Sequence, residues 1–165
     1  MAKPTNEVIS LPDFPVTIVR KLEGHFIHDD LNLSELVKGK QKGLILYFYP
    51  KDNTPGCTTQ ATDFTEHLHD FDEIGYDIIG VSRDSIESHE KFIEKHDLQI
   101  PLISDSDEKL CHYFEVIKEK NMYGKKTMGL VRSAFIFDKE GHLTHAQRNL
   151  RAKDYAERVL TILAS

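Results

Sequence analysis

Cys57, one of two cysteines in the chain, stands where a buried strand is expected to give way to a helix. Residues 44–49 are apolar or aromatic and carry no charge, which is typical of a buried strand. Pro50 ends this strand because proline has no N–H for the ladder, and residues 51–56 are rich in turn formers. Cys57 is therefore predicted to lie in the first turn of the helix that follows. Apolar residues then recur at steps of three and four, as on one face of a helix: Ala61, Phe64, Leu68 and Phe71.

This position favours reactive thiol chemistry. The thiolate is the nucleophilic form of cysteine, and a free cysteine with a pKa near ~8.5 is mostly protonated at neutral pH. First-turn N–H groups and the positive end of the helix dipole stabilise the anion. Thr54 could direct its hydroxyl at the sulfur or at a substrate oxygen, while Pro50 and Pro55 stiffen the approach. The alternative left open by the residues is that Cys57 is a small buried hydrophobic side chain, as many free cysteines are.

The residues around Cys57 resemble the active-site signature of the peroxiredoxins, thiol enzymes that reduce peroxides. Pro50-x-x-x-Thr54-x-x-Cys57 matches that signature, and residues 47–58 are similar to the bacterioferritin comigratory protein (peroxiredoxin Q) subfamily. The resemblance implies an antioxidant, thioredoxin-dependent peroxidase that reduces hydrogen peroxide and organic hydroperoxides. Cys57 would cycle through a sulfenic acid. No metal, haem or flavin is implied, because the thiol itself supplies the two electrons.

Arg132 stands in an otherwise apolar segment, residues 130–136, that is predicted to form a strand. From spacing alone its side chain could simply face solvent. In peroxiredoxins an arginine at the start of this strand lies beside the cysteine, and Gly129-x-x-Arg132-x-x-Phe135 fits the subfamily pattern. The resemblance implies that its permanent charge holds Cys57 as thiolate and polarises the peroxide. The expected catalytic residues are Cys57, Thr54, Arg132 and Pro50, and the expected substrate-binding residues are Gly56, Thr54 and Arg132.

The chain departs from its subfamily in the second thiol. Many members have a resolving cysteine at the positions of Thr62 or Ile93, and Cys111 is the only other thiol here. Cys111 could be a buried structural residue, could resolve Cys57 after local unfolding, or could pair between two subunits, and a disulfide needs Cα atoms within roughly 7 Å. The first case implies a one-cysteine enzyme. Its sulfenic acid would be reduced by an external thiol, either thioredoxin or glutathione with glutaredoxin.

Composition predicts one globular domain over residues 1–165. The chain is 39% hydrophobic and 29% charged, and its net charge of -6 argues against nucleic acid or an anionic membrane as a partner. No stretch approaches the ~20 apolar residues of a membrane span. The first seven residues lack the apolar core of a secretory signal, so the expected location is cytoplasmic. The resemblance implies a monomer. The nine histidines are interpreted as surface residues, and a metal site is not expected.

The pattern of elements predicts an α/β thioredoxin-like fold, with a central mixed β-sheet flanked by helices, an N-terminal extension and an insertion. A strand, helix, strand, helix order implies parallel crossovers, and Ser85 is expected to cap the second helix. Residues 122–129 are predicted to form a loop, and residues 130–146 a hairpin. The predicted strands cover residues 16–19, 43–49, 76–82, 130–137 and 142–146, and the predicted helices cover residues 57–74, 86–96, 108–114 and 152–163.

Three other functions compete with the peroxidase. A thiol–disulfide oxidoreductase usually requires Cys-x-x-Cys, and Cys57-Thr58-Thr59-Gln60 lacks the second sulfur. A peroxide sensor or holdase would keep a reactive Cys57 without sustained turnover. A thioredoxin-fold binding module with an inert thiol would leave the combination of Pro50, Thr54, Cys57 and Arg132 unexplained.

Overall fold

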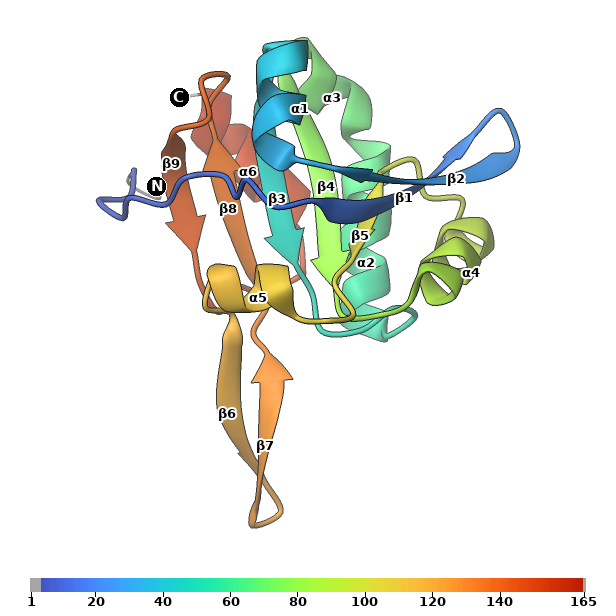
Figure 1. Ribbon diagram of the computed structural model, residues 1–165, viewed down its shortest axis with the longest axis vertical. Coiled ribbons are helices and arrows are strands. Elements are labelled where there is room, and N and C mark those ends of the chain that lie inside the picture. The colour runs from blue at the N-terminus through green and yellow to red at the C-terminus, as the bar shows by residue number, and fades with distance from the viewer. Residues whose placement is uncertain (1–3, 165) are drawn as a thin grey trace.

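A seven-stranded mixed sheet forms the centre of this computed structural model, which describes residues 4–164 (Figure 1). The strand order is β2-β1-β5-β4-β3-β8-β9, with β3 parallel to β4 and β4 parallel to β5. The other four pairs are antiparallel. The strands of this sheet are β1 Val16–Leu22, β2 His25–Leu31, β3 Gly43–Phe48, β4 Tyr76–Ser82, β5 Leu102–Ser104, β8 Ser133–Phe137 and β9 Leu143–Gln147.

The central strand β3 separates two apolar clusters, one on each face of the sheet. Ile45 and Tyr47 belong to the first cluster, whereas Leu44, Leu46 and Phe48 belong to the second, as the alternation of side chains along a strand requires. All six residues of β3 are buried, which is expected of a central strand covered on both faces.

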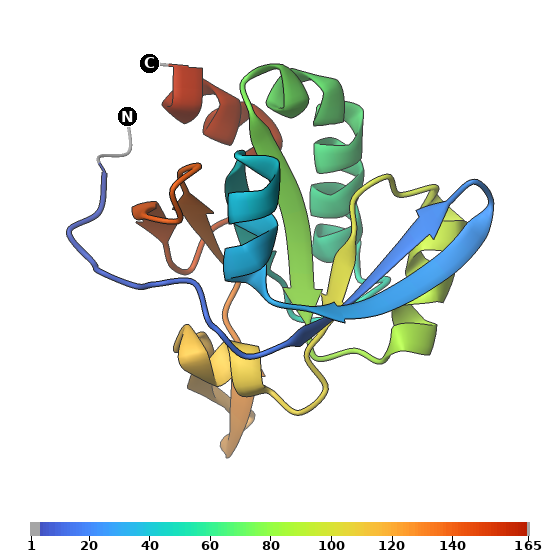
Figure 2. The ribbon, with the colours of Figure 1, turned by 45° about the horizontal axis from the view of Figure 1, so that its top comes forward.

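Helices cover both faces of the sheet, and Figure 2 shows α1 and α2 on opposite sides of it. The first cluster includes buried residues of α2, α4 and α6, and the second includes buried residues of α1 and α5. The helices are α1 Leu33–Lys40, α2 Pro55–Glu66, α3 Leu68–Glu73, α4 Ile86–His96, α5 Lys109–Tyr113 and α6 Tyr155–Ala164. Ser85 caps α4 as predicted, because its side chain accepts a hydrogen bond from the backbone N–H of Ser88.

The predicted α/β class is confirmed, but three local predictions are wrong. The helix expected over residues 57–74 is interrupted at His67, where φ is -99° and ψ is 9°, and continues as α3. The loop expected over residues 122–129 lies mostly in a hairpin of β6 Ile117–Met122 and β7 Lys125–Leu130. This hairpin has little apolar character beyond its base, so its sequence lacks the alternation that marks a half-buried strand. Arg132 lies in the connection between β7 and β8 rather than within a strand.

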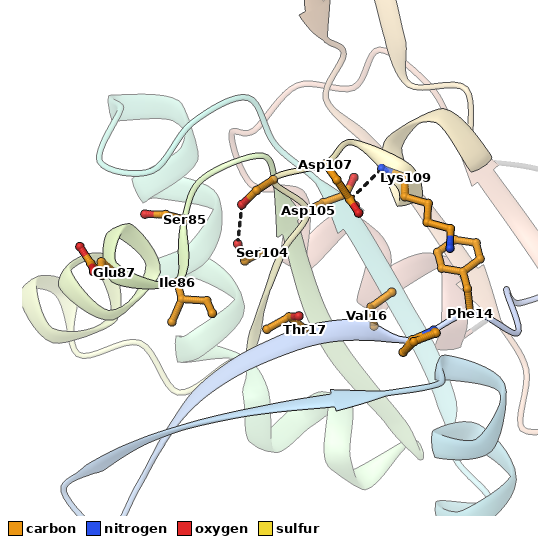
Figure 3. Close-up of a pocket in the computed structure, with 12 residues that line it drawn as sticks. Phe14, Val16, Thr17, Ser85, Ile86, Glu87, Ser104, Asp105, Asp107 and Lys109 are labelled. Carbon is orange, nitrogen blue, oxygen red and sulfur yellow. Dashed lines mark hydrogen bonds between the residues drawn. The ribbon is translucent and has the colours of Figure 1, made fainter.

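A pocket of about 570 Å³ opens where the start of β1 meets the N-terminal ends of α4 and α5 (Figure 3). Polar side chains such as Thr17, Ser85 and Asp105 line it. Its lining does not include Cys57, Thr54 or Arg132, so this pocket is separate from the predicted site. Within residues 4–164, no helix combines the length and the hydrophobicity that a membrane crossing requires.

Candidate active site

Cys57 is the third residue of α2, the helix that follows β3 after the loop of residues 49–54. Thr54 occupies the N-cap position with extended angles, φ -90° and ψ 153°, and Pro55 follows at the first helical position. Proline suits that position because the missing N–H would have no partner within the helix. The Cys57 side chain therefore lies in the first turn, where unpaired N–H groups and the helix dipole favour an anion. Only 1% of Cys57 is exposed, so the thiol is shielded from bulk water.

The Arg132 guanidinium joins two residues of α2 that lie one turn apart. Its Nη2 donates to Cys57 Sγ at 3.2 Å, and its Nη1 donates to Gln60 Oε1 at 2.6 Å. Cys57 and Gln60 are three residues apart and so lie on the same face of the helix. The structure thus brings together two residues that are 75 positions apart in the sequence.

Gln60 is a site residue that the sequence alone did not single out. It is fully buried, and its amide holds the guanidinium without neutralising it. Among residues 4–164, Arg132 forms no ion pair with a carboxylate, so its positive charge is available to the sulfur. A charged donor at 3.2 Å stabilises a thiolate more than the neutral thiol.

The other expected site residues take different roles in this structure. The Thr54 hydroxyl donates to the carbonyl of Lys51 at 2.9 Å and not to the sulfur. Gly56 lies under the guanidinium, because a Cβ placed there would be 3.2 Å from Arg132 Nη2. The hydrogen bonding of β3 continues to Tyr49, whose N–H donates to the Val81 carbonyl, and Pro50 comes directly after it. The roles of Thr54, Gly56 and Pro50 towards a bound peroxide remain predictions.

A buried polar network anchors the loop that carries these residues. Asp52, in the middle of the loop, accepts hydrogen bonds from Tyr49 Oη at 2.6 Å and from Ser88 Oγ at 2.8 Å. His89 Nδ1 lies 2.7 Å from Asp52 Oδ2, and the other ring nitrogen lies 2.9 Å from the carbonyl oxygen of Ile103. Both ring nitrogens of His89 thus face acceptors.

This network contradicts the interpretation of the histidines as surface residues, since the His89 side chain is completely buried. It connects the loop between β3 and α2 to helix α4. Asp52 and His89 are 37 residues apart, and no local pattern announces that they meet. A buried, fully hydrogen-bonded network is rigid. The network is therefore expected to hold the loop in one conformation before a substrate binds.

Tyr47 adds a second polar group to the interior near the sulfur. Its ring packs against Phe64, with ring centroids 4.9 Å apart. Within the described residues its buried hydroxyl has no hydrogen-bond partner. Burial raises the pKa of Tyr47 well above its usual value, and a negative charge on Cys57 raises it further. Tyr47 is therefore a neutral phenol, able to donate a hydrogen bond to an oxygen atom that reaches it.

Cys111 lies on the opposite face of the sheet from Cys57. It belongs to the second apolar cluster together with Leu110 and Phe114, whereas Cys57 belongs to the first. Its backbone N–H donates to Asp105 Oδ2 at 2.7 Å. Burial, assisted by the Asp105 carboxylate, raises the pKa of the Cys111 thiol far above its usual value. Cys111 is thus a neutral, buried thiol, as expected of a structural cysteine. The described residues also contain no group of three histidine, cysteine or acidic side chains placed to hold a metal.

The family model and the curated relatives that this chain matches agree with one another. Residues 10–146 match the model of the AhpC/TSA family. A curated peroxiredoxin Bcp of Xanthomonas campestris is 51% identical over 120 residues, which cover 73% of this chain and 75% of the relative. A peroxiredoxin Bcp of Bacillus subtilis is 48% identical over 124 residues, covering 75% and 79%.

Solved structures extend this likeness to almost the whole chain. The structure of Xanthomonas campestris peroxiredoxin Q superposes with a TM-score of 0.83 and 43% identity, covering 97% of this chain and 98% of the other. A structure of the bacterioferritin comigratory protein of the same organism, from work on its alkyl peroxide reduction activity, has a TM-score of 0.81 at 42% identity, covering 94% and 96%. The predicted thioredoxin-like peroxiredoxin fold is thereby confirmed.

Proposed function

The chain belongs to the AhpC/TSA family and is a peroxiredoxin of the Bcp type, and we propose that it reduces hydroperoxides at Cys57. The observation that carries the assignment of Cys57 is the contact of Arg132 Nη2 with its sulfur at 3.2 Å, at the N-terminal end of α2. The proposed substrates are hydrogen peroxide and organic hydroperoxides. A relative studied for alkyl peroxide reduction supports the second class.

The proposed reaction begins with the Cys57 thiolate. The sulfur attacks the distal oxygen of ROOH, an S–O bond forms, and the O–O bond breaks. The two bonding electrons leave with RO⁻, which takes up a proton to give the alcohol or water. The sulfur is oxidised by two electrons and becomes a sulfenic acid. Arg132 and the first-turn N–H groups of Gly56 and Cys57 stabilise the charge that moves onto oxygen, and we assign Thr54 to the substrate oxygen and Pro50 to shaping the loop.

The sulfenic acid is then reduced by a thiol. A thiolate R′S⁻ attacks the sulfenic sulfur, an S–S bond forms, and the S–O bond breaks. The hydroxide that leaves takes up a proton to give water, and a mixed disulfide remains. A second thiol attacks this disulfide, giving an external disulfide and the Cys57 thiolate. We propose that both thiols come from outside the chain, from thioredoxin or from glutathione with glutaredoxin. The burial of Cys111 on the other face of the sheet supports this one-cysteine cycle.

A monomer acting as one domain in the reducing cytoplasm, within cell redox homeostasis, fits a chain with two free cysteines. Its net charge of -6 gives no general basic surface for nucleic acid or for anionic lipid.

The test compares the two cysteines directly. The reduced protein is treated with one equivalent of hydrogen peroxide, trapped with a sulfenic-acid reagent, and mapped by mass spectrometry. We expect the trap on Cys57 and a free thiol at Cys111. Steady-state turnover should vanish in Cys57→Ser and persist in the matched control Cys111→Ala. Substantial turnover in Cys57→Ser would refute the assignment, and one oxidation without recycling would favour a peroxide sensor.

A further inference from the structure

The hairpin of β6 and β7, residues 117–130, projects from the body (Figure 1). It leaves the body at the end of the sheet where β3 leads into the loop before α2. We call this hairpin the arm. Each strand has six residues, so the arm is about 20 Å long at roughly 3.3 Å per residue. Its base is fixed, because Leu130 is buried and the Val131 N–H donates to the Val116 carbonyl at 2.8 Å. The next residue along the chain is Arg132, which contacts the sulfur.

One face of the arm carries only positive charge. Residues opposite one another in an antiparallel pair share a face, and the register pairs Lys118 with Gly129, Lys120 with Thr127 and Met122 with Lys125. The three lysines named in these pairs therefore lie on the same face, and all three are exposed. We call this the lysine face.

The opposite face differs in both charge and orientation. The arm's one acidic residue, Glu119, lies there and forms an exposed ion pair with Lys126 at 3.9 Å. Leu130 is also on that face and packs into the second apolar cluster, the one that contains Cys111. The lysine face is thus turned away from the cluster of Cys111. It concentrates positive charge on a chain whose net charge is -6.

The tip of the arm presents an aromatic side chain that the turn itself does not require. Tyr123 and Gly124 form a two-residue loop with φ values of 53° and 78°. Such type I′ loops favour Asn, Asp or Gly at the first position, and a bulky residue there is strained. Tyr123 is 99% exposed and therefore gains no burial in return. Tyrosine is enriched at protein–protein interfaces, where it provides an anchor with few rotatable bonds.

We propose that the arm docks the protein that reduces oxidised Cys57, and that this partner presents a carboxylate-rich surface beside its thiol. The inference rests on the proposed function, because it assigns a binding surface for the second half of that cycle. Cys57 is 1% exposed, so a protein thiol has to be held close to the site to reach it. The lysine face supplies charge complementarity and speeds the encounter. Tyr123 supplies the apolar contact.

The first experiment reverses charge on the lysine face. Lys118→Glu/Lys125→Glu is compared with a matched control, Lys38→Glu/Lys139→Glu, which makes the same charge change at exposed positions elsewhere. Thioredoxin and glutaredoxin, each with its recycling system, are offered to the peroxide-oxidised protein. The arm variant should be reduced about tenfold more slowly at low salt, with the difference shrinking at high salt. The control should change far less, and dithiothreitol should reduce all three proteins equally fast.

A second variant separates docking from folding. Tyr123→Asn suits the turn better, so the melting temperature should stay or rise while the KM for the protein reductant increases severalfold. Equal effects in the arm variant and its control would overturn the proposal. The proposal would also be overturned if neither thioredoxin nor glutaredoxin reduced oxidised Cys57 faster than dithiothreitol does. It would be overturned, too, if the wild-type protein were a dimer that dissociates when the charge on the lysine face is reversed. The trapped sulfenic acid at Cys57 is measured beforehand, and its absence would instead refute the peroxidase.

Discussion

Replacing Asp52 with Asn should cost about 3–5 kcal/mol of the free energy of unfolding, the usual range when one partner of a buried pair is removed. The side chains of His89 and Asp52 are 0% and 2% exposed, and the atoms Nδ1 and Oδ2 lie 2.7 Å apart. An amide cannot satisfy His89 as the carboxylate does. It also disturbs the hydrogen bonds from Tyr49 and Ser88 to the same carboxylate.

The expected loss is large compared with the total. A domain has about 5–15 kcal/mol of stability, and for 150–250 residues each kcal/mol shifts the melting temperature by roughly 2–4 °C. Asp52→Asn should therefore melt about 6–20 °C lower, as followed by circular dichroism and by urea unfolding. The control is Lys21→Met, which breaks the Lys21–Glu94 pair at 2.6 Å with side chains 30% and 61% exposed. That change should cost no more than about 1 kcal/mol.

This reasoning would be refuted if Asp52→Asn lowered the free energy of unfolding by no more than the Lys21→Met control does. Such a result would mean that the network does not hold the loop against α4. Ser88→Ala offers an internal scale, since it removes only one hydrogen bond to the same carboxylate and should cost about 1 kcal/mol. Asp52→Asn should therefore cost clearly more than either Ser88→Ala or Lys21→Met.

Three further changes test the site. Arg132→Met should slow the stopped-flow reaction of Cys57 with hydrogen peroxide about 10- to 100-fold, because a charged hydrogen bond is worth about 1.5–3 kcal/mol; a loss below threefold would contradict it. Gln60→Glu should slow the same reaction, since a carboxylate would compete for the Arg132 charge, and an equal or faster rate would count against this role. The pKa of Cys111 is raised in the fold, so the unfolded thiol ionises first and stability should fall above about pH 8.5, by up to ~1.4 kcal/mol per pH unit. Cys111→Ala should flatten this decline in urea unfolding at pH 8, 9 and 10, and an unchanged slope would contradict it.

Local patterns in the sequence were enough to place Cys57. The charge-free strand before Pro50 and the apolar repeat after Cys57 each depend on neighbouring residues, and both elements occur in the structure. The N-cap at Ser85 was likewise predictable, because a cap is a local hydrogen bond. The parallel order of β3, β4 and β5 follows from alternating strands and helices.

Contacts that depend on tertiary structure were not predictable. Asp52 and His89 meet only because α4 packs beside the loop after β3, and a buried histidine looks like a surface one in a polar helix sequence. In the sequence Gln60 has no feature that sets it apart from other helix residues, and its role follows only from its hydrogen bond with Arg132 in the folded structure. The two strands of the arm were not predicted, because they face solvent on both sides over most of their length and show no apolar periodicity.

The sheet itself explains why a reductant should come from outside. Cys57 and Cys111 lie in clusters on opposite faces of the sheet, and a disulfide requires Cα atoms within about 7 Å. Both thiols are buried, so bringing them together would require the chain around at least one of them to unfold. An oxidised Cys57 would instead wait for an external thiol, and a waiting sulfenic acid is exposed to further oxidation. The proposed one-cysteine cycle and the proposed docking role of the arm are therefore linked, because a cycle without an internal resolving thiol benefits most from a surface that brings the external thiol to the site sooner.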